Sequence, residues 1–385
     1  MSMVLTLFFT RNVSLKLWLD QGLFDREKLI YEEYLKQGRC KQIYWLTYGS
    51  NDSRLAAELK NDNKLHPGII VIGMPKLFNF PKVGSYIYSF FIPFLYPKIF
   101  QQTNILKTNQ MDGSWCGVFA KWLYNKPLVV RTGYSISQLL CNNRSSITRC
   151  TTYKIIEKYV YKFGDLAIVS SYHNRKYIEE MHGVERKDIL VLYNYINLDV
   201  FFPRNEIKKY TNRVLYVGRL NPEKNLFNLI EAISNTGLIL DVYGTGEQPE
   251  RQLREFATEC NAAVNFYGVV HNNLLSAVYN QYSYYVLPSY HEGMPKTLLE
   301  AMSSGCLCIG TDVPGINEII VDGVNGILSR STSSHDICKA LQRALYVKNK
   351  DVLIQNGIRM IKNRCALNSI VQKEFKAFTG LLNAG

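Results

Sequence analysis

Residues 288–305 read P-S-Y-H-E-G-M-P-K-T-L-L-E-A-M-S-S-G, and this stretch decides the fold of the second half of the chain. The apolar residues Tyr284–Pro288 predict a short buried strand before the turn. Pro295 predicts the first position of a helix, because the amide hydrogen that proline lacks would have no partner there. Gly305 predicts the end of that helix. A strand, a tight turn and a helix in this order form the repeating unit of α/β sheets.

The start of this predicted helix is suited to an anion. The backbone amides of Lys296, Thr297 and Leu298 would point out of the helix end, where the macrodipole favours negative charge. Glu292 lies on the predicted turn and Glu300 on the predicted helix. The neighbours of Glu300 are mostly apolar, and burying a carboxylate among them costs free energy, so we expect this carboxylate to have a function. Chance spacing of two solvated side chains is the alternative. Together these features favour a site for a phosphorylated, polyhydroxylated ligand such as a nucleotide sugar.

The composition is that of a globular enzyme in a reducing compartment. At 385 residues the chain exceeds the size at which single cores stop growing, so two domains are expected. Hydrophobic residues make up 47% and charged residues 20%, which excludes a disordered or fibrous chain. Nine cysteines show no paired framework, and Cys306 and Cys308 lack the spacing of a metal site. We therefore expect reduced thiols and a cytoplasmic protein.

Strand-like and helix-like segments alternate along the chain, and the pattern restarts after residue 200. Strands are expected at residues 3–9, 42–48, 69–73, 128–130, 166–170 and 189–193, then at 214–217, 239–243, 264–267, 284–287, 307–310 and 326–328. Helices are expected at residues 26–37, 155–161, 226–233, 250–260, 274–280, 296–304, 336–347 and 369–382.

This alternation predicts two doubly wound, Rossmann-like α/β domains. We place them at residues 1–200 and 201–365, with residues 366–385 as a C-terminal helix that crosses back to pack on the first domain. The first boundary falls in a polar segment without periodicity. A ligand would lie in the central cleft, at the carboxyl ends of the strands.

Two more loops at predicted strand ends contain residues suited to binding a phosphorylated ligand. Gly218 and Arg219 follow the strand at 214–217, and Lys224 stands at the start of the next helix. The two cations would bracket a diphosphate, Arg by its planar fork and Lys as a point charge, although either alone is equally consistent with solvated surface. Gly244 and Gly246 follow the strand at 239–243. Without a third glycine in phase they are weak evidence for a dinucleotide fold, and we interpret them as letting the backbone approach a ligand.

Residues 190–330 resemble the retaining glycosyltransferases of the two-Rossmann (GT-B) fold, family 4-like, which build surface polysaccharides and glycolipids. The segment Y-N-Y-I-N-L-D-V-F-F-P at 193–203 is similar to the interdomain motif of that family, and V-G-R-L-N-P-E-K-N at 217–225 is similar to its phosphate loop. Residues 292–326 are similar to its nucleotide-sugar motif almost throughout.

The resemblance implies a role for each residue of the donor site. Glu292 would contact the donor sugar hydroxyls and the developing positive charge, and Glu300 would accept hydrogen bonds from the ribose. Arg219 and Lys224 would neutralise the departing diphosphate. Backbone amides at 294–297 would hold sugar and phosphate, and the strand end at 269–270 would bind the base. The implied donor-binding set beyond the catalytic Glu292, Arg219 and Lys224 is Glu300, Gly218, Gly244, Val269, Val270, Gly293, Met294, Pro295, Lys296 and Thr297.

The expected reaction moves a hexosyl group from a UDP- or GDP-sugar to a glycan or lipid-linked acceptor. Preorganised cations and helix amides stabilise the departing diphosphate without a metal, and the sequence has no Asp-x-Asp motif. We therefore expect no metal and no cofactor besides the donor. Retention of the anomeric configuration is implied by the resemblance. The alternatives are a sugar-nucleotide epimerase of similar fold and a non-catalytic nucleotide-sugar-binding subunit.

The first half of the chain carries most of the positive charge. Residues 1–200 hold 26 Lys and Arg against 16 Asp and Glu, whereas residues 201–385 hold 19 against 16. An aromatic, proline-interrupted stretch at 78–96 lies in the basic half. This combination favours contact with an anionic surface such as the inner face of a membrane, and a buried aromatic helix is the alternative. No nucleic-acid-binding motif is present, so nucleic acid is not an expected partner.

The first domain should hold the acceptor. Trp18, on the long segment that follows the first strand, is a candidate to stack on a sugar face. Residues 130–134, V-R-T-G-Y, resemble the family segment that faces the donor. Many relatives have a histidine there, and this chain has Arg131, so no histidine role is implied.

Overall fold

The computed structural model describes residues 2–142 and 146–384, and the chain forms two compact units. The N-terminal unit comprises Met1–Leu192 and Val371–Gly385, and the C-terminal unit comprises Tyr193–Ile370. The sequence placed these boundaries at 200/201 and 365/366. The first boundary lies earlier because the segment after Leu192 bonds to the C-terminal unit: the Asn194 side chain donates to the Met294 carbonyl at 2.7 Å.

The N-terminal unit contains a seven-stranded parallel sheet in the order β3-β2-β1-β4-β5-β6-β7. Its order reverses between β1 and β4, which is the switch point of a doubly wound sheet. The sequence pattern missed β4, a four-residue strand whose charged Lys107 interrupts the apolar run. The strands are β1 (Met3–Phe8), β2 (Cys40–Leu46), β3 (Ile69–Ile72), β4 (Ile105–Thr108), β5 (Leu128–Thr132), β6 (Leu166–Val169) and β7 (Ile189–Val191).

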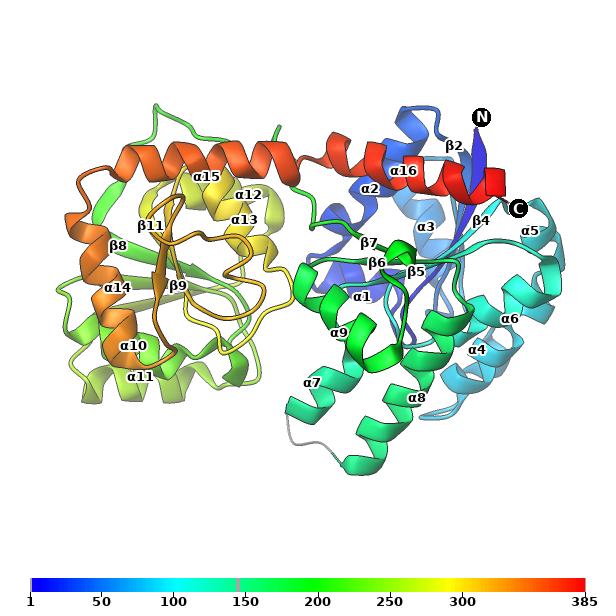
Figure 1. The fold of residues 1–385 in the computed structure, drawn as a ribbon, viewed down its shortest axis with the longest axis horizontal. Helices are drawn as coiled ribbons and strands as arrows, with labels where there is room; N and C mark the ends of the chain where they lie inside the picture. The colour runs from blue at the N-terminus through cyan, green and yellow to red at the C-terminus, as the bar shows by residue number, and fades with distance from the viewer. Residues whose placement is uncertain (1, 143–145, 385) are drawn as a thin grey trace. The chain divides into compact units, whose positions relative to one another are not determined.

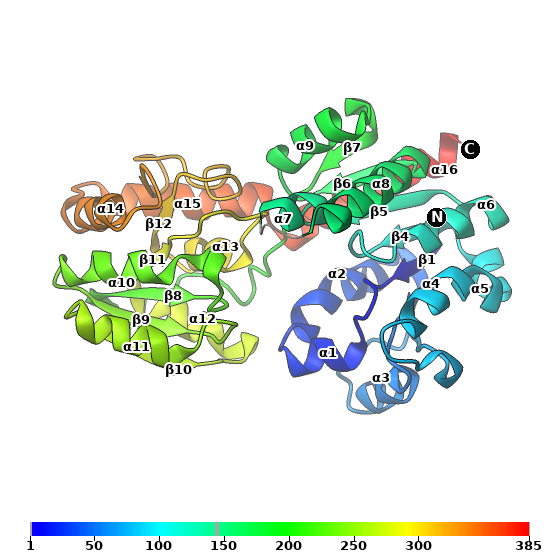
Figure 2. The same cartoon turned by 90° about the horizontal axis from the view of Figure 1, so that it is seen from below.

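Helices flank this sheet (Figure 1). Three of them, α4, α5 and α6, lie side by side (Figure 2). The helices of the unit are α1 (Leu15–Asp20), α2 (Phe24–Lys36), α3 (Asp52–Asn61), α4 (Gly84–Leu95), α5 (Pro97–Gln102), α6 (Trp115–Tyr124), α7 (Ile136–Asn142), α8 (Ile147–Phe163) and α9 (Tyr172–His182).

The C-terminal unit contains a six-stranded parallel sheet in the order β10-β9-β8-β11-β12-β13. Its switch point lies between β8 and β11, so the loops that follow these two strands emerge next to each other. The strands are β8 (Tyr210–Val217), β9 (Ile239–Tyr243), β10 (Val264–Gly268), β11 (Tyr282–Leu287), β12 (Leu307–Thr311) and β13 (Ile327–Ser329).

Two helical layers cover the faces of this second sheet (Figure 1). The first layer holds α10 (Leu226–Ser234), α11 (Glu250–Glu259) and α14 (Ser334–Tyr346), and the second holds α12 (Asn272–Asn280), α13 (Lys296–Ser303) and α15 (Lys350–Arg364). The sequence pattern missed α15, which carries a glycine in its interior. That glycine, Gly357, lets the helix approach α13 closely, because a Cβ there would lie 2.8 Å from Met302.

The C-terminal helix α16 (Leu367–Ala384) packs on the N-terminal unit through a buried ion pair, as the sequence predicted for its terminal helix. Glu374 Oε1 of α16 lies 2.6 Å from Lys107 Nζ on β4, and Glu374 Oε2 accepts a hydrogen bond from the Tyr34 hydroxyl of α2. Both charged side chains are at most 2% exposed. Burial lowers the pKa of Lys107, and the Glu374 carboxylate opposes that shift. A buried cation without its partner would be costly, so this pair fixes where α16 docks.

Removing one partner of this pair should destabilise the N-terminal unit. We expect Glu374→Ala to cost about 3–5 kcal/mol, because Lys107 would remain buried without a counter-charge. Thermal unfolding and hydrogen exchange of α16 would measure the effect. The double variant Lys107→Met/Glu374→Leu should recover most of the loss. If it unfolds as early as Glu374→Ala, the ion pair is not what anchors the helix.

Candidate functional site

The switch point of the C-terminal sheet brings Glu292 and Lys224 into direct contact. Glu292 Oε1 accepts hydrogen bonds from Lys224 Nζ at 2.6 Å and from Ser289 Oγ at 2.7 Å. The Lys224 and Glu292 side chains are 14% and 10% exposed, so water screens the pair only in part. An ammonium has three donors, and those not used by Glu292 remain for another anion.

Three consecutive residues of the β8 loop bond to the β11 loop. The Lys224 contact with Glu292 is flanked by Tyr290 N, which donates to the Glu223 carbonyl at 2.9 Å. On its other side the Asn225 side chain donates to the Pro288 carbonyl at 3.0 Å. The two loops therefore form one rigid unit around the carboxylate.

Sequence reasoning missed three residues that support this arrangement. Asn225 is buried in the left-handed conformation with φ of 58°, a conformation that Asn tolerates better than most residues. Ser289 orients Glu292, and its carbonyl accepts from Thr311 Oγ1 at 2.6 Å. Gly315 has φ of 84°, and a Cβ there would lie 2.5 Å from the Glu292 carbonyl. The dipeptide Pro314-Gly315 was the available signal for this close approach.

Arg219, the other predicted cation, lies at the surface. Its side chain is 73% exposed and has Glu223 at 3.8 Å, a distance too long for a strong ion pair at such exposure. Its backbone is fixed, because the Tyr216 hydroxyl donates to the Arg219 carbonyl at 2.7 Å. Burial, with a contribution from Glu292, raises the pKa of Tyr216 well above its ordinary value, so this hydroxyl stays a donor.

Gly218 and Gly244 allow two loops of the protein to touch each other. A Cβ on Gly244 would lie 1.9 Å from the Gly218 carbonyl oxygen, and one on Gly246 would lie 2.4 Å from Leu220 N. Leu220 N also donates to the Thr245 carbonyl at 3.0 Å. The close neighbour of these glycines is therefore the chain's own β8 loop, and the approach of their backbone to a ligand stays a prediction.

Helix α13 begins at Lys296, as its periodicity predicted, but Pro295 is not the first helical residue. Pro295 is the N-cap of α13 with an extended ψ of 107°, and Lys296 is the first helical residue. The reason is that the Pro295 carbonyl already accepts the first intrahelical bond, from Leu299 N at 3.4 Å. Within residues 2–142 and 146–384, the amides of Thr297 and Leu298 have no hydrogen-bond acceptor.

Three contacts hold the residues just before α13 and in its first turn. The Asn194 side chain binds the carbonyl of Met294, which is buried, and Lys296 Nζ lies 4.8 Å from the centre of the Tyr195 ring. The Tyr285 hydroxyl donates to Thr297 Oγ1 at 2.9 Å. These contacts preorganise the backbone between Glu292 and Glu300. Gly293 lies within this segment and is partly exposed.

Glu300 is nearly inaccessible. It is 2% exposed and accepts a hydrogen bond from the buried Tyr279 hydroxyl at 3.1 Å. Burial and the neighbouring carboxylate raise the pKa of Tyr279 well above its ordinary value. Tyr279 thus stays protonated and satisfies part of the carboxylate. Val269 and Val270 directly follow β10 at the carboxyl edge of the same sheet, and Val269 is 66% exposed.

Buried polar atoms without partners gather at the loops of this edge. Among the residues that the structure describes, Asn225 Oδ1, Gln248 Oε1 and His291 Nε2 have no hydrogen-bond partner. They belong to the loops that follow β8, β9 and β11. Buried polar groups normally find partners, so these three atoms are able to bond with water or with a polar ligand at this edge.

The N-terminal unit places its predicted residues differently. Trp18 is 4% exposed and packs against Phe9 and Trp45 at ring-centre distances of 4.3 and 5.5 Å, so the expectation that it stacks on a sugar is wrong. Trp18 and Leu15, three residues apart in α1, are on the side of this helix that faces the core. Gly133, in the segment 130–134, accepts a hydrogen bond at its carbonyl from Ser170 Oγ at 2.8 Å.

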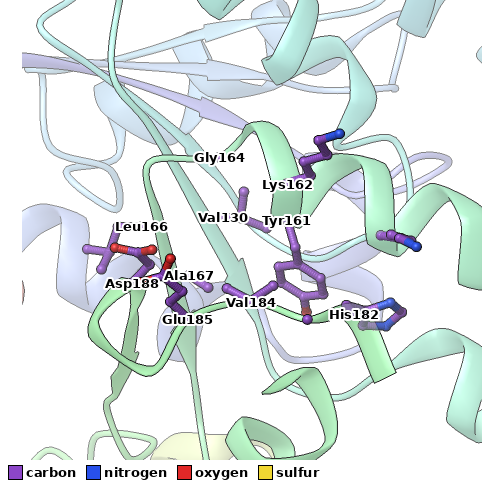
Figure 3. A pocket seen from close by; sticks show the side chains of 12 residues that line it. Val130, Tyr161, Lys162, Gly164, Leu166, Ala167, His182, Val184, Glu185 and Asp188 are labelled. Atoms are coloured by element: carbon purple, nitrogen blue, oxygen red, sulfur yellow. The ribbon is translucent and has the colours of Figure 1, made fainter. Parts of the chain in front are cut away.

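Two pockets of about 410 and 400 Å³ lie away from these residues. The first, in the N-terminal unit, is lined by Tyr161 and His182, whose ring centres are 5.5 Å apart (Figure 3). It opens where Gly164 and Asp188 precede β6 and β7, at the amino ends of these strands. Ligands of doubly wound sheets bind at the opposite edge. The second pocket lies beside β13, and neither is lined by Glu292 or Glu300.

Within the described ranges, no cluster of three or more His, Cys, Asp and Glu side chains is arranged to hold a metal ion. In the same residues, no helix is both long and apolar enough to cross a membrane.

Comparison with known proteins identifies the family. The family described as "Glycosyl transferases group 1" matches residues 199–360, which include every residue of the predicted donor site. The O-antigen biosynthesis glycosyltransferase WbnH of Escherichia coli is 30% identical over 262 residues, covering 66% of this chain and 72% of WbnH. The chain belongs to the group 1 glycosyltransferases.

Further relatives of this group 1 glycosyltransferase are more distant. The UDP-Gal:alpha-D-GlcNAc-diphosphoundecaprenol alpha-1,3-galactosyltransferase of Escherichia coli is 25% identical over 281 residues, 68% of this chain and 72% of that enzyme. Three other curated relatives are matched over only 62%, 45% and 25% of their own length. The structure of Anabaena HepE with UDP and glucose superposes with a TM-score of 0.75 at 16% identity, covering 98% of this chain and 100% of HepE. This likeness shows the two-domain GT-B fold.

The glycine contacts can be tested by a matched pair of variants. We expect Gly244→Ala to destabilise the C-terminal unit by about 3 kcal/mol or more, because its Cβ would overlap the Gly218 carbonyl. Gly237→Ala is the control for a positive φ without crowding: its φ is 70°, against 140° for Gly244, and no atom lies within 4 Å of the added Cβ. It should cost only about 1–2 kcal/mol of backbone strain. Urea unfolding measures both, and equal losses would contradict the close-contact explanation.

Proposed function

We propose that the protein is a retaining, metal-independent glycosyltransferase that moves a hexosyl group from a nucleoside-diphosphate sugar to a glycan or lipid-linked acceptor. The observation that carries this proposal is the Lys224–Glu292 pair at the switch point, beside the open amides of α13. A cation, a carboxylate and free helix amides at one sheet edge match a diphosphate joined to a sugar.

The donor side supports a division of labour. Lys224 and the surface cation Arg219 would take the diphosphate with the first amides of α13. Glu292, already held by Ser289, would face the sugar hydroxyls and the positive charge that develops at the anomeric carbon. Glu300 would accept hydrogen bonds from the ribose hydroxyls, the role that the family resemblance implies for it, while Tyr279 holds its carboxylate in place. Val269 and Val270 would lie against the base, and HepE, which has the same fold, was solved with UDP.

The reaction then needs only these groups. The bond from the anomeric carbon to the diphosphate breaks, and the acceptor oxygen bonds to that carbon on the same face. The acceptor proton leaves with the departing diphosphate. The cations and helix amides stabilise the charge on the leaving group, which is the role a metal would otherwise fill. We propose that no cofactor besides the donor takes part.

A UDP-hexose and a lipid-diphosphate-linked acceptor are the substrates we propose to try first. This choice rests on relatives: one galactosyltransferase is named for UDP-Gal and a diphosphoundecaprenol acceptor, and WbnH is named for O-antigen biosynthesis. A lipid-linked acceptor would require the N-terminal unit to work beside a membrane.

Glu292→Gln tests the reaction. It keeps the size of the side chain and its contact with Ser289 but removes the charge, so transfer should fall at least about a hundredfold. UDP affinity, measured by calorimetry, should change little. Nucleotide release from a panel of UDP- and GDP-sugars, with acceptor extracts and with or without EDTA, gives the rate. Glu255→Gln on the exposed face of α11 is the control and should be fully active.

Four outcomes would overturn parts of this proposal. Wild-type transfer by Glu292→Gln would exclude Glu292 as a catalytic residue. Loss of activity in EDTA that added Mg²⁺ restores would exclude metal independence. Binding of UDP without release from any donor would favour the non-catalytic binding subunit, and conversion of the donor into its epimer would favour an epimerase.

Glu300→Gln tests the ribose contact separately. The amide oxygen can still accept from Tyr279, so the fold should be kept, while hydrogen bonds from ribose hydroxyls to a charged group are lost. We expect UDP-sugar affinity to fall about tenfold or more with a smaller change in kcat. Pyrophosphate, which has no ribose, is the control ligand, and its affinity should not change. If the affinity for UDP is also unchanged, Glu300 serves only the packing of Tyr279.

A further inference from the structure

Helix α4 and the turn before it expose a row of large apolar side chains in the N-terminal unit. We refer to Leu77, Phe80, Ile87, Phe90, Phe91 and Phe94 as the α4 face. Phe94 is 62% exposed, Phe80 58% and Phe91 51%. Contiguous exposed apolar surface of this kind marks an interaction site more often than isolated residues do.

The α4 face belongs to a helix that is firmly anchored on its other side. Tyr88 and Ile92 are at most 1% exposed, and Ser89 accepts a hydrogen bond from the Trp115 indole at 3.0 Å. Ile87, Phe91 and Phe94 are spaced by four and three residues, so they share the opposite side of the helix. The helix is thus half buried, which differs from the fully buried aromatic helix that the sequence left open.

The charged residues of the segment that carries the α4 face all have one sign. Lys76, Lys82 and Lys98 flank it and are exposed. The sequence has no Asp or Glu between Asp62 and Asp112. Three exposed lysines in a segment without acidic residues are complementary to an anionic surface. It argues against a protein partner, since lysine is depleted at protein–protein interfaces.

The dimensions fit insertion into the interface of a bilayer. Helix α4 has 12 residues, fewer than the roughly 20 that a spanning helix needs. A short helix with aromatic residues on one face and lysines at its rim lies in the headgroup region instead.

The α4 face adjoins the switch point of the N-terminal sheet. Arg11, directly after β1, donates to Ser85 of α4 at 3.3 Å and lies over the Tyr86 ring at 3.8 Å. Arg11 also pairs at 3.0 Å with Asp112, which follows β4. The first turn of α4 is therefore attached to the sheet edge at which a doubly wound domain binds its ligand.

We propose that the α4 face docks the protein on an anionic phospholipid bilayer and presents this edge of the N-terminal unit to acceptors carried on lipid. The docking step rests on the exposed face and its charge alone. The presentation of a lipid-linked acceptor rests in addition on the proposed function.

Flotation of the full-length protein with vesicles tests the docking step without donor or acceptor. We expect binding to vesicles of phosphatidylcholine mixed with phosphatidylglycerol, weaker binding to phosphatidylcholine alone, and a loss of the difference at high salt. Phe91→Ser/Phe94→Ser should weaken partitioning at least about tenfold on both vesicles. Lys76→Glu/Lys82→Glu should abolish the preference for the anionic vesicles.

Matched changes in the C-terminal unit provide the controls. Tyr346 and Val352 are 82% and 56% exposed, and Tyr346→Ser/Val352→Ser should float like the wild type. Failure of the wild type to float, or equal flotation of the phenylalanine variant, would overturn the proposal. A concentration-dependent dimer in sedimentation that the phenylalanine variant loses, without flotation of the wild type, would assign the face to a second copy of the chain.

Nucleotide release from the donor, measured without vesicles, separates this proposal from the proposed function. The phenylalanine variant should release nucleotide at the wild-type rate, because the α4 face lies outside the donor-binding unit. A protein that floats but releases no nucleotide from any donor would refute the transferase activity and leave the docking surface in place.

Discussion

The parallel order of the C-terminal sheet is the constraint on which the candidate site depends. Because β8 and β11 are parallel neighbours on either side of the switch point, the loops that follow them emerge together at one edge. Residues 223–225 and 288–292, far apart in sequence, then bond through two backbone carbonyls and the Lys224–Glu292 ion pair. An antiparallel pairing would send these loops to opposite edges and separate the cation from the carboxylate.

The side chain of Glu292 is held in position by contacts within the protein. Glu292 has its geometry set by Ser289 and Lys224, and Gly315 lets the loop after β12 support it from behind. Arg219 is the opposite case, a cation on a fixed backbone with an exposed side chain that is able to reorient. The two cations of these loops therefore differ: Lys224 is held against the carboxylate, whereas the Arg219 side chain is 73% exposed.

The N-terminal unit uses buried charge for a structural purpose. Lys107 and Glu374 are at most 2% exposed, and their mutual contact fixes the C-terminal helix on β4. Its core is rich in buried aromatic residues such as Phe8, Trp45 and Phe100, whereas several large apolar residues of α4 and the turn before it are exposed. Exposed apolar residues grouped on one helix are the feature on which the proposed docking surface rests.

The sequence by itself determined the α/β class, the two doubly wound sheets and the residues of the donor loops, because strand and helix periodicities and a long local motif do not depend on distant contacts. It missed β4 and α15, whose Lys107 and Gly357 break the local pattern but are explained by Glu374 and Met302. It also placed Trp18 on a ligand surface when packing against Phe9 buries it. Only the tertiary structure decided which partner each polar group finds: Lys224 for Glu292, Tyr279 for Glu300, and the chain's own backbone for Gly244. The physical reason is that these pairs depend on which strands are neighbours in the sheet. The strand order cannot be inferred from any local stretch of the sequence.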